Sequence, residues 1–380
     1  MSLIYLDNSA TSYPKAPGVA DAVRDNLLSC GTSGRASYDE ALEGSRVLYE
    51  CRRNLAKLFS LPDSSRIILN SGATESLNTI IKGFLKPGMK ALTSMGEHNS
   101  VMRPLNTLME KGVTVERFHC LNDGTADLDD YKSKLKSGPD LVILCHSSNV
   151  SGALFPVKEM IRDAHEAGAL VCLDGAQSAG HKTINLIKLN ADFYCFAGHK
   201  GLLGPAGTGG FYIKDGIEIS SLLEGGTGSA SEEEIQPRFL PDLYESGTRN
   251  IPGLAGLRAS TDFLLTTGVD VIGKKEKDLA LRLIEGLKMI EGITLIGPEN
   301  PASRNSVVSF FHDRVDLSEL AEGLDDAEIA QRMGLHCAPS AHKSLGTYDR
   351  GGTIRFSPGY FNSEEDIDSA LKAVREIVNG

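Results

Sequence analysis

The stretch that decides the fold is Phe196-Ala-Gly-His-Lys-Gly-Leu-Leu-Gly-Pro205. It overlaps the end of an apolar run, residues 192–197, whose length and β-rich composition predict a buried strand. The strand ends at Gly198, and Lys200 comes two residues later. A lysine at the mouth of a buried strand loses solvation, which lowers its pKa and frees its amine as a nucleophile. Taken alone, Lys200 has a second interpretation, a strand-end lysine that simply reaches water.

Polar side chains follow the carboxyl ends of five predicted strands. Apolar runs typical of buried strands alternate with helices along residues 66–213, which predicts an α/β fold with a mostly parallel central sheet covered by helices. Ligands of open α/β sheets bind at the edge formed by the carboxyl ends of the strands. We therefore expect one ligand site at this edge. Its polar residues are Thr74, His98, Asn149, Asp174, Gln177, His199 and Lys200.

Two of these strand ends leave two interpretations open. Ser71-Gly-Ala-Thr-Glu75 turns from a strand directly into a helix, where free N–H groups bind phosphate, but Ser71 or Thr74 could equally cap that helix. Asp174 could hold a protonated ring nitrogen or cap a helix. An aldehyde cofactor that carries a phosphate, pyridoxal 5'-phosphate, would use all of these groups, with an imine on Lys200 and its pyridine nitrogen on Asp174.

Composition excludes several classes of partner. The formal net charge of −11 argues against a nucleic-acid or anionic-membrane partner. No apolar run approaches the roughly 20 residues that span a bilayer, and the N-terminus shows no signal-peptide pattern. Seven scattered cysteines show no metal-ligand spacing, so we expect no metal site and a cytoplasmic location. Four of them are expected to be inert packing residues, namely Cys51, Cys145, Cys172 and Cys195.

The chain is long enough for two domains. We expect a large domain over residues 15–250 and a smaller α+β domain formed by residues 1–14 and 251–380, joined by a long helix near 269–289. The smaller domain alternates short strands with helices. Its last helix follows Ser363-x-x-Asp366, the pattern of a helix cap.

Five ordered motifs together carry a family resemblance over nearly the whole chain. They are Tyr5-Leu-Asp-Asn-Ser-Ala-Thr11, Ser71-Gly-Ala-Thr-Glu-Ser-Leu-Asn78, Leu173-Asp-Gly-Ala-Gln-Ser178, Gly198-His-Lys200 and Arg355-Phe-Ser-Pro-Gly-Tyr360. With them the chain resembles the class V aminotransferases, and within these the cysteine desulfurases and selenocysteine lyases. The resemblance implies fold type I of the pyridoxal-phosphate-dependent transferases and a homodimer with shared active sites.

The same resemblance implies a role for each matching residue. Lys200 is the Schiff-base lysine and Asp174 pairs with the pyridine nitrogen, while His98 stacks on the ring and Gln177 bonds its hydroxyl. Asn149 and Arg355 bind the substrate carboxylate, a task that suits a planar guanidinium. The phosphate is held by Ala73, Thr74 and His199, together with Thr248 of the partner subunit.

Cys337 decides the subfamily. Its segment, Arg332-Met-Gly-Leu-His-Cys-Ala338, is similar to the loop of the second desulfurase group. The resemblance implies that the Cys337 thiolate takes sulfur from L-cysteine, leaving L-alanine and an enzyme persulfide that a sulfur-acceptor protein discharges. Two alternatives stay open: an aminotransferase, or a lyase that acts on selenocysteine or another amino acid without persulfide transfer. A dinucleotide-binding protein is disfavoured because no G-x-G-x-x-G follows the first strand.

Two positions and one loop depart from the family pattern. Ala197 stands where related enzymes often have a phosphate-binding serine, and Leu335 stands where a second histidine is usual. The glycine-rich loop at residues 30–37 lacks its histidine-rich form. These departures bear on the substrate and the sulfur acceptor, not on the fold.

Overall fold

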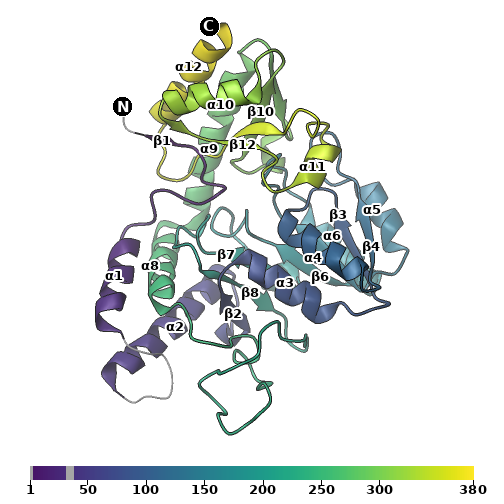
Figure 1. Cartoon of the computed structure of the whole chain (residues 1–380), viewed down its shortest axis with the longest axis vertical. Coiled ribbons are helices and arrows are strands. Elements are labelled where there is room, and N and C mark those ends of the chain that lie inside the picture. The colour runs from purple at the N-terminus through teal and green to yellow at the C-terminus, as the bar shows by residue number, and fades with distance from the viewer. Residues whose placement is uncertain (1–2, 31–37) are drawn as a thin grey trace.

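A central sheet of seven strands organises the larger part of the molecule (Figure 1). The computed structural model describes residues 3–30 and 38–380, so most of the glycine-rich loop lies outside the described residues. In spatial order the strands are β2 (Ile67–Asn70), β8 (Gly209–Ile213), β7 (Phe193–Ala197), β6 (Leu170–Asp174), β5 (Leu141–Cys145), β3 (Lys90–Ser94) and β4 (Thr114–Phe118). β8 runs antiparallel to both of its neighbours, and the remaining pairs are parallel. The expected mostly parallel sheet is confirmed.

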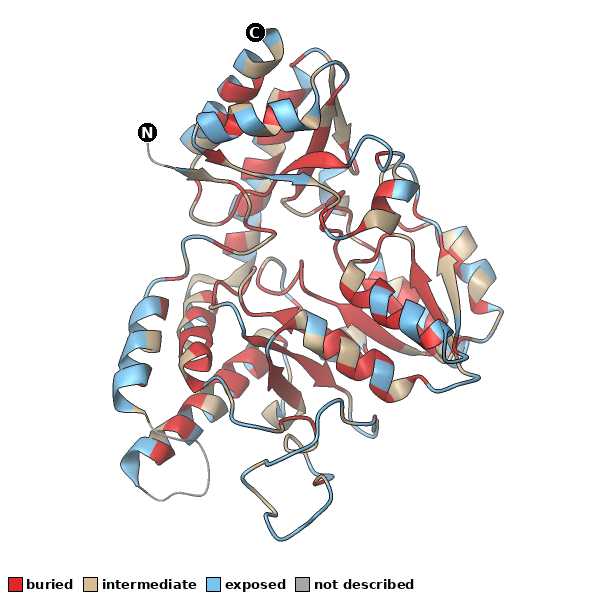
Figure 2. Cartoon of the chain, viewed as in Figure 1, coloured by how far each residue is buried: buried red, intermediate tan, exposed pale blue. Residues whose placement is uncertain are grey.

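Helices cover both faces of this sheet. They are α1 (Val19–Ser29), α2 (Asp39–Leu58), α3 (Ala73–Phe84), α4 (Asn99–Met109), α5 (Leu128–Leu135), α6 (Val157–Glu166), α7 (Leu186–Leu189) and α8 (Ile251–Thr267). Because side chains alternate along a strand, Val142 and Leu144 of β5 belong to the core that contains residues of α2, α6 and α8, whereas Leu141 and Ile143 belong to the core that contains residues of α3 and α4. The central strands β5, β6 and β7 are therefore buried on both sides (Figure 2).

The smaller part contains an antiparallel sheet. Its strands, in spatial order, are β12 (Arg332–Gly334), β13 (Thr353–Phe356), β10 (Val308–His312) and β9 (Ile293–Ile296). A separate parallel pair joins β1 (Ile4–Tyr5) to β11 (Ile329–Ala330). The helices of this part are α9 (Val269–Lys288), α10 (Leu317–Asp326), α11 (Pro339–Ser344) and α12 (Glu364–Asn379). Strands as short as β11 and β12 show no alternation in the sequence, so they were not predicted.

The long helix α9 connects the two parts. Its Ile272 packs in the core of the large sheet, whereas Leu279 and Leu283 pack in the core of the smaller part. The preceding helix α8 packs with the large sheet. The domain boundary expected at residue 250 stays a prediction. From the packing of α8 and α9 we propose a different boundary, inside α9, between the larger and the smaller part.

Within the described residues, no helix combines the length and the apolar character needed to cross a membrane.

Candidate active site

The carboxyl ends of five strands surround one cavity of about 140 Å³. The strands are β2, β3, β5, β6 and β7, and the seven polar residues expected at this edge all line the cavity. Ala73 and Ala197 line it too, as do Cys145, which was expected only as a packing residue, and two residues that the sequence did not single out, Ser100 and Ser147. The strand order of the sheet therefore brings the predicted residues together, although Thr74 and Lys200 are 126 positions apart in the sequence.

Lys200 and Asp174 face the same cavity from neighbouring strands, β7 and β6. Burial lowers the pKa of Lys200 to about 8, against the opposing attraction of Asp174. Burial also raises the pKa of Asp174, which a bond from the Ala176 amide to Oδ1 (2.9 Å) and the Lys200 charge partly offset. No helix starts directly after Asp174, so the helix-cap interpretation is wrong. Lys200 is thus a lysine whose amine becomes available near neutral pH.

The N-terminus of α3 opens into the cavity without a side-chain cap. Gly72 occupies the N-cap position with φ of 142°, and neither Ser71 nor Thr74 caps the helix. The carboxylate of Glu75 turns back to the Ser71 amide (3.0 Å), and the Thr74 hydroxyl lies 2.8 Å from that of Ser100. The capping interpretation is therefore wrong, and this end of the helix dipole faces the cavity.

His98 is the N-cap of α4. Its Nδ1 accepts the Ser100 amide proton (3.1 Å), so a neutral ring carries its proton on Nε2. Burial, reinforced by the charge of Lys200, lowers the pKa of His98 to about 4. The imidazole is therefore neutral at physiological pH and can stack on an aromatic ring without adding charge.

The N-terminal segment contacts two of the residues that line the cavity, Gln177 and His199. The Gln177 amide donates to the Ser9 carbonyl (2.9 Å), which fixes its orientation. The backbone carbonyl of His199 accepts from Ser12 N (2.9 Å) and from the Lys15 ammonium (3.1 Å). Burial lowers the pKa of the His199 ring to about 4, so this residue is also neutral. Residues far apart in sequence thus hold the loop around Lys200.

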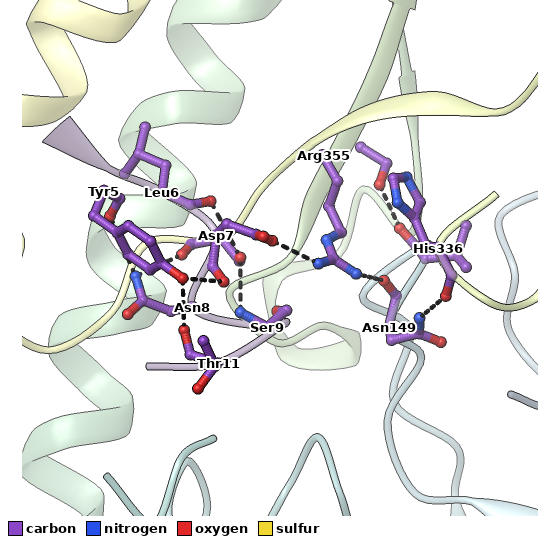
Figure 3. A network of polar contacts seen from close by, with 12 residues as sticks. Tyr5, Leu6, Asp7, Asn8, Ser9, Thr11, Asn149, His336 and Arg355 are labelled. Atoms are coloured by element: carbon purple, nitrogen blue, oxygen red, sulfur yellow. Dashed lines mark hydrogen bonds and ion pairs between the residues drawn. The ribbon is translucent and has the colours of Figure 1, made fainter. Parts of the chain in front are cut away.

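Arg355 lies on β13, does not line the cavity, and points toward Asp7 and Asn149 (Figure 3). Its Nη2 lies 2.8 Å from Oδ1 of Asp7, and its Nη1 donates to the Asn149 carbonyl (3.1 Å). The side-chain amide of Asn149 donates in turn to the His336 carbonyl (2.7 Å). The chain of contacts in Figure 3 therefore links the N-terminal segment, the end of β5 and the loop of Cys337.

Cys337 is exposed and lies between β12 and α11. His336 and Cys337 both have left-handed backbone angles, φ of 48° and 57°, and the Cys337 carbonyl accepts from the Asn99 amide (2.8 Å). A Cys337 thiolate would raise the pKa values of Lys200 and Arg355, so the sulfur lies within electrostatic range of both. The four cysteines expected to be packing residues are buried, as predicted.

Thr248 is exposed and does not line the cavity, so its phosphate role stays a prediction that depends on a second subunit. Ser100 and Asp7 were missed as site residues. Asp7 could have been suspected as a carboxylate directly after a short apolar strand, whereas Ser100 carries no signal beyond its place two residues after His98.

The described residues contain no group of three or more His, Cys, Asp and Glu side chains arranged to hold a metal ion.

Comparisons with known proteins identify the class to which this fold and site belong. The aminotransferase class-V family model matches residues 4–370, and the chain belongs to this family. It is 32% identical to a probable cysteine desulfurase of Methanothermobacter thermautotrophicus, over 98% of this chain and 94% of that protein. It is 33% identical to a probable cysteine desulfurase of Pyrococcus abyssi, over 99% and 94%.

Solved structures agree with the sequence comparison. The apo cysteine desulfurase from Thermococcus onnurineus NA1 superposes with a TM-score of 0.93 at 32% identity, covering 100% of this chain and 95% of that one. The cysteine desulfurase CsdA from Escherichia coli, in an S-sulfonic acid form, superposes with a TM-score of 0.89 at 28% identity, covering 99% and 95%. The chain is thus a cysteine desulfurase-like member of the class V aminotransferase family, with fold type I.

Proposed function

We propose that this protein is a pyridoxal-phosphate-dependent cysteine desulfurase that carries sulfur on Cys337. The observation that supports the proposal most is that two groups line one cavity. They are Lys200, with a pKa of about 8, and the buried carboxylate of Asp174 on the neighbouring strand. An exposed cysteine within electrostatic range of that lysine adds the group that sulfur transfer needs.

The donor set of the cavity fits pyridoxal 5'-phosphate. Lys200 would hold the cofactor covalently, Asp174 would pair with its ring nitrogen, and the uncapped N-terminus of α3 would face its phosphate beside Thr74 and His199. The neutral His98 would lie against the ring. When bound, the cofactor supplies an electron sink for the substrate α-carbon.

Arg355 and Asn149 would bind the substrate carboxylate. The guanidinium is buried and its Nη1 donates to the Asn149 carbonyl, so it is already oriented when a carboxylate arrives. Asn149 also positions the Cys337 loop through the His336 carbonyl, and this arrangement would place the thiol close to the bound substrate.

Cys337 would take the sulfur. Its thiolate forms a bond with the substrate sulfur, the substrate bond between β-carbon and sulfur breaks, and the electron pair of that bond stays on the β-carbon. The β-carbon then takes up a proton to give L-alanine, and Cys337 carries a persulfide. A thiol on a sulfur-acceptor protein would remove the outer sulfur and return Cys337 to the thiol state.

We further propose a cytoplasmic homodimer in which Thr248 of the partner subunit reaches the phosphate. The exposure of Thr248 outside its own chain's cavity supports this arrangement.

The test is to reconstitute the protein with pyridoxal phosphate and to assay alanine and sulfide with L-cysteine as the substrate. Cys337→Ser should retain the absorbance band of the bound cofactor but lose desulfuration, whereas Lys200→Ala should lose both. Retained alanine and sulfide formation by Cys337→Ser would favour a lyase without persulfide transfer. Transamination by both the wild type and Cys337→Ser, with no sulfide, would favour an aminotransferase.

A further inference from the structure

Asp7 and Arg355 form an ion pair that joins the two ends of the chain. Asp7 follows β1 and Arg355 lies on β13, and their side chains are 16% and 3% exposed. The turn around Asp7 is held by backbone groups, since its carbonyl accepts from the Ala10 amide (3.0 Å). The Asp7 side chain is therefore free of that structural task and contacts Arg355 directly (Figure 3).

The guanidinium of Arg355 has no other carboxylate partner among the described residues. Its Nη1 donates to the Asn149 carbonyl, and its Nε is buried with no hydrogen-bond partner in the part of the chain that the structure describes. Two cationic side chains lie nearby, because Arg332 pairs with Arg355 in the strand register and Lys200 lies within electrostatic range. Asp7 thus provides the negative charge that this guanidinium needs while no substrate is bound.

We propose that Asp7 is an intramolecular competitor for the substrate carboxylate and so sets the affinity of the site for amino acids. The inference rests on the proposed role of Arg355 as the carboxylate-binding residue. A substrate carboxylate that reaches Arg355 must share the guanidinium with Asp7, and two like charges close to one another repel. Asp7 therefore keeps Arg355 paired in the free enzyme and lowers the affinity for every ligand that carries a carboxylate.

A purely orienting role for Asp7 predicts the opposite sign. If Asp7 did no more than hold the guanidinium in place, its removal would release Arg355 and weaken carboxylate binding. The two interpretations are separated by a binding measurement on a neutral variant of nearly the same shape.

The experiment measures the dissociation constant of L-alanine, the expected product, by calorimetry on the cofactor-loaded protein. The variants are Asp7→Asn, Arg355→Gln and the double variant, with Asp7→Ser as a second replacement that also suits a turn. We expect both Asp7 variants to bind L-alanine about tenfold more tightly than the wild type. Replacement of Asp7 in the Arg355→Gln background should change nothing, because the competition acts through the guanidinium.

Two controls test the chemistry. L-alaninamide has no carboxylate, so Asp7→Asn should leave its affinity unchanged. Asp368 of α12 forms an exposed ion pair with Arg282 of α9. Asp368→Asn removes this carboxylate and should leave L-alanine binding unchanged.

The outcomes test the carboxylate-binding role of Arg355 and the competitor role of Asp7 separately. If Arg355→Gln binds L-alanine as tightly as the wild type, the carboxylate role of Arg355 is wrong. If Arg355→Gln weakens binding but the Asp7 variants bind L-alanine no more tightly than the wild type, the competitor role alone is overturned.

Discussion

Lys200 must be uncharged to react with an aldehyde, and burial in the cavity makes that state accessible. Its pKa of about 8 results from desolvation, which the Asp174 carboxylate opposes. We therefore expect the rate at which the cofactor-free protein takes up pyridoxal phosphate to rise with pH, with a midpoint near pH 8, as followed by absorbance. Asp174→Asn removes the charge that raises the pKa, so its midpoint should move to lower pH. A wild-type midpoint near the ordinary lysine value of about 10.4 would contradict this account.

At this scale the sequence predicted the identity of the groups but not their states. Lys200 and Asp174 could be predicted because each follows an apolar strand, where a charged residue is costly. The tautomer of His98 could not be predicted, since it depends on the direction of the Ser100 amide. The partner of Arg355 lies 348 positions away, and no local pattern points to it.

The ends of β3 and β5 are joined by a buried acid that the sequence did not single out. Glu97 is fully buried and accepts from the Ser94 hydroxyl (2.7 Å) and from the Cys145 amide (2.9 Å). Burial raises its pKa to about 8, so it is protonated at neutral pH. This uncharged acid fixes the strand end from which His98 projects.

A pH-dependent stability difference follows from Glu97. Between about pH 5 and pH 8 the folded protein holds a proton that the unfolded chain releases, so the free energy of unfolding falls as pH rises. Glu97→Gln lacks this dependence. Urea unfolding should show the wild type losing about 1–4 kcal/mol relative to the variant over this range. Parallel pH profiles for the two proteins would show that Glu97 is ionised in the fold.

The cap of α12 was predicted from the sequence and is confirmed. Ser363 Oγ accepts from the Asp366 amide (3.2 Å), and the Asp366 carboxylate accepts from the Ser363 amide (3.0 Å). Ser363→Ala should lower the free energy of unfolding by about 1 kcal/mol, measured by urea titration. Ser369→Ala, at an exposed position inside the same helix, is the matched control and should not destabilise. Equal stability of the two variants would mean that the cap contributes nothing.

Across the whole molecule, the strand ends were predicted better than the connections between distant segments. The alternation of apolar runs and helices predicts a mostly parallel sheet, and that sheet places Thr74, His98, Asn149, Asp174 and Lys200 at one edge. The sequence gives no sign that β1 pairs with β11, because a two-residue strand has no periodicity. The isolated bridge between Asp7 and Ser357, which also has no local signal, brings Asp7 to Arg355.

The proposed site takes its residues from both parts of the molecule, and contacts between distant segments hold them together. The larger part supplies the cofactor cavity, and the smaller part supplies Arg355 and the Cys337 loop. The loop meets the larger part through the Asn149 side chain and the Asn99 amide. Sulfur transfer would therefore take place where the two parts meet.

The most direct test of the central claim is mass spectrometry of the cofactor-loaded protein after a brief incubation with L-cysteine and no acceptor thiol. We predict the added mass of one sulfur atom on the peptide that contains Cys337, with one alanine released for each sulfur bound. Alanine release with no sulfur on Cys337, or with the sulfur on another cysteine, would contradict the account.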